Sequence, residues 1–111
     1  MDILIQATGI TLAEKLKATI EDKIAHLEQY APRAIRARVR VRKVSAHASG
    51  RQYCVRILCE IPGNDLSAEE HGAEVLSALE AAAAKIERRL SKRKTERLAK
   101  RERGPRAKEK S

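Results

Sequence analysis

The residues best suited to chemistry in this chain are cations near its C-terminal end. The spacings i, i+3, i+4, i+7 and i+8 are occupied by Lys85, Arg88, Arg89, Lys92 and Arg93. At 100° per residue in an α-helix, these side chains fall within an arc of about 140° beside the apolar stripe of the same segment. Guanidinium and ammonium groups arranged in this way bind phosphate oxygens, and each neutralised phosphate releases a counterion. We call these five residues the basic flank.

The positive charge of the chain is concentrated at the same end. The 111 residues include 24 Lys and Arg against 15 Asp and Glu, a formal net charge of +9. Residues 1–84 hold 11 of each sign, whereas residues 85–111 hold 13 basic and 4 acidic side chains. A solvated helix end accounts for one or two cations but not for this density, because like charges repel. We favour binding to an anionic polymer; a solvated helix end and a membrane-surface helix stay as alternatives.

Residues for catalysis or for holding a metal do not converge in the sequence. The three histidines, His26, His47 and His71, are predicted on a helix, in a loop and at a strand end. Neither an H-x-x-x-H nor a C-x-x-C spacing is present, nor is a Gly-rich phosphate loop. We therefore expect no enzyme activity, no metal, no cofactor and no small-molecule substrate.

The sequence also predicts a cytoplasmic protein that does not enter a membrane. No apolar run approaches the roughly 20 residues that span a bilayer, and the start of the chain lacks the features of a secretory signal. Cys54 and Cys59 would lie about 16 Å apart on opposite faces of one strand, too far apart for a disulfide. Both are expected to be reduced structural thiols.

The elements that position these residues begin with a strand and a helix. Residues 3–7 form a β-rich run, which predicts a strand. Thr11 precedes Glu14 by three residues, which is the capping-box spacing that starts a helix. The helix is expected to run to about Gln29, with Pro32 as its stop. Its apolar stripe comprises Leu12, Leu16, Ile20, Ile24 and Leu27.

Three further strands are predicted next. Residues 35–44 alternate between apolar and basic side chains, which indicates a strand with one buried face. Residues 45–50 form a polar loop, and residues 52–61 form the next strand. A tight turn at residues 62–65 then leads into the last strand, near 66–70. The buried faces would comprise Ile35, Ala37, Val39 and Val41, and then Tyr53, Val55, Ile57 and Cys59.

A long helix closes the chain and carries the basic flank. It begins near Gly72, extends to about Arg101 and is expected to end at Gly104-Pro105, leaving a disordered tail. Its apolar stripe comprises Val75, Leu79, Ala82, Ile86 and Leu90. The order β-α-β-β-β-α predicts an α+β two-layer sandwich, with a four-stranded mixed sheet and both helices on one face. We divide the chain into a domain over residues 1–94 and a basic extension over residues 95–111.

The solvent-exposed face of the predicted strand over residues 35–44 carries a second group of cations. This row comprises Arg36, Arg38, Arg40 and Arg42. One interpretation is neutralisation within the sheet by Glu60, Asp65, Ser67 and Glu69 on opposing strands. The other is a secondary RNA contact. The neutral balance of residues 1–84 favours the first.

The type of nucleic acid follows from the scarcity of aromatic residues. Tyr30 and Tyr53 are the only aromatic side chains, so a platform for stacking single-stranded bases is lacking. Recognition of backbone and shape, as in folded RNA, is favoured instead.

Two helical segments resemble the ribosome hibernation-promoting factor family. Residues 23–30, KIAHLEQY, are similar to the family's K-[LF]-x-K-L-E-[KQ]-[YW] segment, and residues 85–92, KIERRLSK, to its K-L-x-R-Q-L-x-K segment. The resemblance covers residues 1 to about 94. It implies a ribosome-associated protein that binds rRNA in the decoding channel of the small ribosomal subunit. There it would overlap mRNA and the A- and P-site tRNAs and hold ribosomes inactive under stress or in stationary phase.

The resemblance also implies which residues contact rRNA. The rRNA-facing basic positions of the family carry over to Lys23, Lys85, Arg88, Arg89 and Lys92, although Arg89 stands where Gln is usual. His26 stands where a Lys is common, and Leu76 stands where the family has a Tyr. We add His26 and Arg93 to the expected rRNA-binding set.

The length predicts a short-form member without the C-terminal domain with which long forms pair ribosomes. In the family, short forms act with a separate ribosome modulation factor, which is the second partner implied here. Two alternatives stay open. One is a general RNA-binding protein or RNA chaperone that uses the same basic flank, and the other is an adaptor whose basic tail docks an acidic protein.

Overall fold

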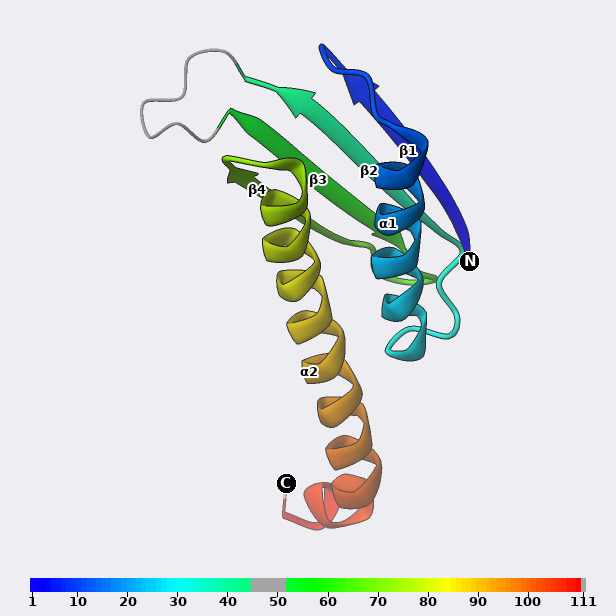
Figure 1. The fold of residues 1–111 in the computed structure, drawn as a ribbon. Helices are drawn as coiled ribbons and strands as arrows, with labels where there is room; N and C mark the ends of the chain where they lie inside the picture. Colours follow the sequence, from blue (N-terminus) through cyan, green and yellow to red (C-terminus); the bar gives the residue numbers. More distant parts are fainter. Residues whose placement is uncertain (45–51, 111) are drawn as a thin grey trace.

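The structure, a computed structural model, describes residues 1–44 and 52–110, with side chains described through Arg93. The strands are β1 Asp2–Thr8, β2 Arg36–Lys43, β3 Tyr53–Glu60 and β4 Leu66–Gly72. The helices are α1 Glu14–Ala25, which the 3₁₀ turn η1 His26–Gln29 continues, and α2 Val75–Lys110. Both helices lie on one face of a single four-stranded sheet (Figure 1). The predicted two-layer α+β sandwich is confirmed.

The sheet follows the predicted strand order and directions. Its order is β1-β2-β3-β4, with β1 and β2 parallel and the other two pairs antiparallel. The crossover through α1 makes the first pair parallel, and the short connection between β3 and β4 makes that pair antiparallel. Because the register places Val39 opposite Ile57 and Val41 opposite Val55, one face of the sheet is continuously apolar. The other face, which we call the outer face, is turned away from the helices.

The core lies between this apolar face and the two helices. Its largest side chains that are completely buried include Ile20 and Ile24 of α1, Ile57 of β3, and Leu79 and Ile86 of α2. Burying an aliphatic side chain of this size contributes about 1.5–3 kcal/mol. Both helical stripes read from the sequence therefore face the core, except that Leu16 is only partly buried.

Two local predictions are wrong: the N-terminal cap of α1 and the burial of Ile35. Thr11 does not cap α1: the N-cap is Ala13, without a side-chain hydrogen bond, and the acidic side chain in the first turn is Glu14. The carboxylate of Glu14 in this first turn interacts favourably with the positive end of the helix dipole. Ile35 was expected in the core but is 58% exposed. It precedes β2, and Ala34 takes the buried position instead.

The last helix is longer than predicted. The pair Gly104-Pro105 was expected to end it, followed by a disordered tail, but α2 continues to Lys110. Proline removes one backbone hydrogen bond and kinks a helix, and here it does not end it. Figure 1 shows the last, red turns of α2 changing direction well beyond the sheet. The predicted loop over residues 45–50 lies outside the described residues.

Glycine is required at the two ends of β4. Gly63 has φ +91° in the turn that precedes the strand, where Asn64 N–H donates to the Ile61 carbonyl at 3.1 Å. At the other end, a Cβ on Gly72 would lie 2.8 Å from the backbone nitrogen of Ala78. The missing side chain therefore lets the first turn of α2 pack directly on the end of β4.

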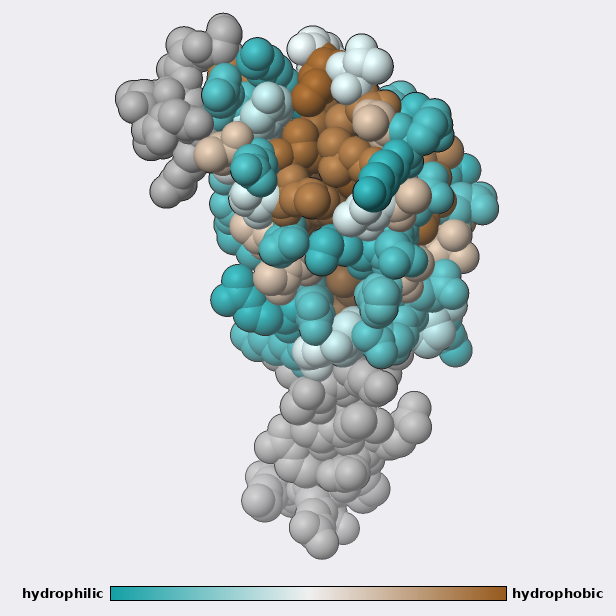
Figure 2. Space-filling model, in the orientation of Figure 1, coloured by the Kyte–Doolittle hydropathy of each residue, from teal (hydrophilic) through white to brown (hydrophobic). Residues whose placement is uncertain are grey.

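The helix layer does not cover the sheet completely. Figure 2 shows apolar atoms gathered between the two helices, with polar side chains around them. Leu16 of α1 and Leu76 of α2 are among the hydrophobic residues only partly buried against the core. Among the described residues, no helix is both long enough and apolar enough to cross a membrane.

Candidate nucleic-acid interface

The basic flank lies on the side of α2 that faces β4. The core stripe of α2 fixes the rotation of the helix, because Ala82, Ile86 and Leu90 are at most 3% exposed. The contacts of the flank are with β4 and the turn before it. Lys85 pairs with the Glu70 carboxylate, and the Arg89 and Arg93 side chains donate hydrogen bonds to backbone carbonyls there. The five cations share one side of the helix.

Three members of the basic flank are held in place by β4 and the turn before it. Arg89 Nη1 donates to the Ser67 carbonyl at 2.6 Å, and Arg93 Nη1 donates to the Asn64 carbonyl at 2.8 Å. A carbonyl orients a guanidinium without cancelling its charge, and each guanidinium keeps further N–H donors. Lys85 differs, because the carboxylate of Glu70 neutralises it. Arg89 and Arg93 are therefore oriented cations, whereas Lys85 is an ion-paired one.

The other two members point to solvent. Arg88 and Lys92 are both exposed and lie one helical turn apart. Arg88 Nε donates at 3.4 Å to the Ala84 carbonyl of its own helix, and neither cation has a carboxylate partner among the described side chains. Among the described side chains, Lys85 is therefore the only member of the flank whose charge a carboxylate neutralises.

Lys23 and His26 lie in a different place from the basic flank. They line the groove between α1 and α2, on the opposite side of α2. Lys23 Nζ lies 3.4 Å from Glu80 Oε1. His26 Nδ1 hydrogen bonds to the Asp22 carbonyl at 2.7 Å. Because a carbonyl can only accept, Nδ1 carries the proton, and Nε2 becomes a donor only when the ring is protonated.

The groove between the helices carries acidic side chains from α2, in addition to the expected cation Lys23. Glu80 and Glu87 of α2 both line it, and Tyr30 donates its hydroxyl hydrogen to Glu87 Oε1 at 2.8 Å. This hydrogen bond raises the pKa of Tyr30, with smaller contributions from partial burial and the charge of Glu87. The helix α2 therefore presents an acidic side to α1 and a basic side to β4. The alternation of signs in the sequence gave no indication of which side faces which neighbour.

The arginine row of β2 is partly neutralised on the outer face of the sheet. Glu60 Oε2 lies 3.6 Å from Arg36 Nη1 and 3.4 Å from Arg38 Nε. Glu69 Oε1 lies 3.9 Å from Arg42 Nη2. Two of the four expected neighbours, Glu60 and Glu69, therefore pair with the row.

The other two expected neighbours of the row contact different groups. Asp65 Oδ1 accepts the Ile61 N–H at 3.0 Å, and Ser67 accepts the Arg89 hydrogen bond through its carbonyl. Arg40 has no carboxylate partner within the described chain, and its cross-strand partner is Arg56 of β3. The strand pattern did not single out Arg56, which adds a cation to the middle of the outer face.

Comparisons with known proteins agree with this architecture. The model of the family described as Sigma 54 modulation protein / S30EA ribosomal protein matches residues 3–98. A curated protein from Deinococcus radiodurans, the ribosome hibernation promotion factor, is 28% identical over 96 residues, which is 86% of this chain and 50% of that protein. The chain thus spans about half the length of this curated relative.

Two solved structures have the same fold. The N-terminal domain of Protein Y from Thermus thermophilus has a TM-score of 0.70 at 20% identity, covering 83% of this chain and 98% of that one. A ribosomal subunit interface protein from Coxiella burnetii has a TM-score of 0.73 at 17% identity, covering 86% and 99%. At these identities the likeness is one of fold.

Proposed function

The chain belongs to the Sigma 54 modulation protein / S30EA ribosomal protein family, and from this premise we propose that it is a ribosome-associated inhibitor of translation. In this proposal, residues 1–94 bind rRNA of the small subunit in the decoding channel and exclude mRNA and the A- and P-site tRNAs. No covalent bond is made or broken, so inhibition lasts only while the protein is bound. The family resemblance supports the place of binding, and the basic flank supports its chemistry.

The observation that carries the proposal is the position of Arg88 and Lys92. Both are exposed, they are one turn apart, and no carboxylate neutralises them among the described side chains. The helix that presents them is anchored by the buried Ile86 and Leu90. Binding to phosphate therefore requires little reordering of the backbone, and the full charge of both side chains is available.

The remaining cations of the expected rRNA site differ in the contacts that they must give up to bind phosphate. Arg89 and Arg93 are already oriented by carbonyls and keep free donors for phosphate oxygens. Lys85 and Lys23 must exchange Glu70 and Glu80 for phosphate. His26 can donate to phosphate through Nε2 only as an imidazolium ion.

A secondary contact by the outer face of the sheet is supported at one point. Arg40 and Arg56 are directly opposite one another, and Arg40 has no carboxylate partner among the described residues, whereas Arg56 also lies opposite Glu69 of β4. Like charges across a strand pair repel, and a phosphate between them would remove that repulsion. We place the secondary contact at these two arginines, because Arg36, Arg38 and Arg42 each have a carboxylate partner.

Charge reversal at the basic flank tests the proposal. The double variant Arg88→Glu/Lys92→Glu should lose co-sedimentation with small ribosomal subunits and no longer suppress translation in vitro. Both side chains are exposed, so circular dichroism and the thermal midpoint should stay close to those of the parent. A matched control, Lys15→Glu/Lys43→Glu, makes the same change in net charge at exposed positions outside the flank.

The result that would overturn the proposal is equal ribosome binding by the parent and the Arg88→Glu/Lys92→Glu variant. Loss of binding in both double variants would show that only net charge matters. A competition experiment addresses the broader alternative of a general RNA-binding protein. Excess bulk tRNA or duplex DNA should leave the parent on small subunits, whereas ready displacement favours general RNA binding.

A further inference from the structure

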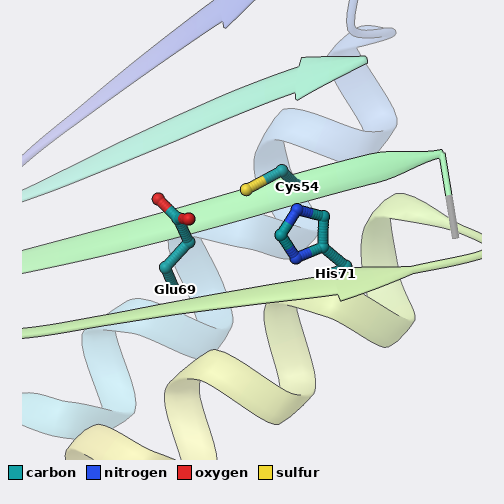
Figure 3. Close-up of side chains that lie close together, drawn as sticks. All are labelled: Cys54, Glu69 and His71. Carbon is teal, nitrogen blue, oxygen red and sulfur yellow. The ribbon is translucent and has the colours of Figure 1, made fainter. Parts of the chain in front are cut away.

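Three side chains with metal-binding atoms meet on the outer face of the sheet, away from the basic flank. Cys54 of β3 and His71 of β4 are cross-strand partners, and Glu69 precedes His71 by two residues on the same face. The sulfur, an imidazole nitrogen and a carboxylate oxygen all lie within 4.8 Å of one another. Figure 3 shows the sulfur of Cys54 lying between Glu69 and His71.

The surroundings of Cys54 differ from those of the other cysteine. Cys59 lies five residues along β3, on the face that packs against the helices, and it belongs to the apolar core. Cys54 is equally buried, at 1% exposure, but on the outer face of the sheet. A metal ion bound by a thiol displaces its proton, so Cys54 would coordinate as the thiolate.

The donor set indicates which ion would bind. Thiolate, imidazole and carboxylate are the ligands of Zn²⁺, which binds four donors in a tetrahedron, at about 2.3 Å for sulfur and about 2.0–2.2 Å for nitrogen and oxygen. Donor atoms around such an ion are roughly 3.5 Å apart, so donors separated by as much as 4.8 Å must move closer together. Glu69 is exposed and can make that adjustment. Ca²⁺ and Mg²⁺ prefer oxygen donors and fit this set poorly.

Two nearby arginines, Arg42 and Arg56, affect how favourably a metal ion can bind. Arg42 Nη2 lies 3.9 Å from Glu69 Oε1, and both side chains are about half exposed. An exposed pair at that distance contributes little to stability, so Arg42 can give up the carboxylate to an incoming ion. Arg56 is the cross-strand partner of Glu69 and adds repulsion toward a dication.

We propose that Cys54, Glu69 and His71 form a Zn²⁺ site with three protein ligands and one position left for water or another ligand. The ion would cross-link β3 to β4, the edge strand of the sheet. Because the three donors come together only in the folded chain, the ion would also stabilise the fold. The site lies away from the basic flank, on the outer face of the sheet, where Glu69 is the cross-strand partner of Arg56 from the proposed secondary RNA contact.

The test uses Co²⁺ as a spectroscopic probe of the full chain without a histidine tag. The parent protein should bind one equivalent of Co²⁺ and show the visible bands of a tetrahedral ion and a thiolate-to-cobalt charge-transfer band. Added Zn²⁺ should displace the Co²⁺, so that all of these bands disappear. Cys54→Ala should abolish the charge-transfer band. The matched control Cys59→Ala, on the same strand, should retain it.

A second variant and a second readout keep the test decisive if Cys54→Ala folds poorly. His71→Gln removes a half-buried ligand and should weaken Zn²⁺ binding by at least about tenfold. Zn²⁺ should raise the thermal midpoint of the parent and of Cys59→Ala but not of His71→Gln. The proposal is overturned if the parent gives no charge-transfer band, or if His71→Gln binds Zn²⁺ as tightly as the parent.

Discussion

The ammonium group of Lys23 in α1 lies 3.4 Å from the carboxylate of Glu80 in α2. About two helical turns further along the same groove, the Tyr30 hydroxyl donates to Glu87 at 2.8 Å. These two contacts join the helices through the acidic side of α2. The cations of the basic flank are consequently turned toward β4 and solvent, and Lys23 is separated from them by the width of the helix.

Neutralising Glu80 should strengthen ribosome binding if Lys23 contacts rRNA. Glu80→Gln frees the Lys23 charge and removes a carboxylate that repels phosphate. An exposed ion pair contributes about 0.2–1 kcal/mol, so we expect affinity to rise by a factor of about 1.5 to 5 with little change in stability. Filter binding to small subunits measures the effect. Glu21→Gln, an exposed neutralisation on α1, is the control, and an equal gain in both variants would count against the Lys23 contact.

Salt dependence should report how many cations of the flank contact phosphate. The logarithm of the binding constant falls linearly with the logarithm of the salt concentration, and each lost phosphate contact reduces the slope by about 1. Arg88→Gln/Lys92→Gln should therefore reduce the magnitude of the slope by about 2. Lys15→Gln/Lys43→Gln should leave it unchanged. A slope that is the same for all three proteins would mean that Arg88 and Lys92 do not contact phosphate.

Reversing one charge of the Arg40–Arg56 pair should stabilise the fold. Arg40→Glu places a carboxylate opposite Arg56, where the parent has two like charges. Cross-strand charge pairs are worth about 0.2–1 kcal/mol, and we expect the free energy of unfolding in urea to rise by that amount. Arg38→Glu makes the same change two residues away, but there it loses the contact with Glu60 and should not stabilise. The secondary RNA contact predicts that Arg40→Glu also weakens ribosome binding.

Stability should decrease in alkaline solution. The hydrogen bond and charge of Glu28 raise the pKa of the Met1 amino group above its ordinary 8.0. Burial, followed by the charge of Asp65, raises the pKa of the Cys59 thiol above its ordinary 9.0. The unfolded chain therefore loses these protons first, so the contribution is complete below about pH 8 and is lost as the pH rises.

Urea titrations at about pH 7 and about pH 9.5 measure this loss. Glu28→Gln removes the partner of the amino group, so its stability should fall less between the two pH values than that of the parent. A parent protein that is equally stable at both values would contradict the assignment.

Local periodicity predicted the elements well. The apolar stripes of Leu12–Leu27 and Val75–Leu90, and the alternation in residues 35–44, repeat with the period of a single element, so no knowledge of neighbours is needed to read them. The errors occurred where tertiary context overrides a local signal. Thr11 had the spacing of a cap and Gly104-Pro105 that of a stop, yet the helices begin and end elsewhere.

The sequence by itself determined that one side of the last helix is cationic, because angle around a helix is fixed by residue spacing. Only the tertiary structure decided that Glu70 neutralises Lys85, while Arg88 and Lys92 have no carboxylate partner among the described side chains, since the packing of α2 on β4 brings Lys85 to Glu70. The same holds for Cys54 and His71. They are 17 positions apart in sequence, and the register between two strands places them opposite each other. Register depends on how the whole sheet buries its apolar face, which no short stretch of residues contains.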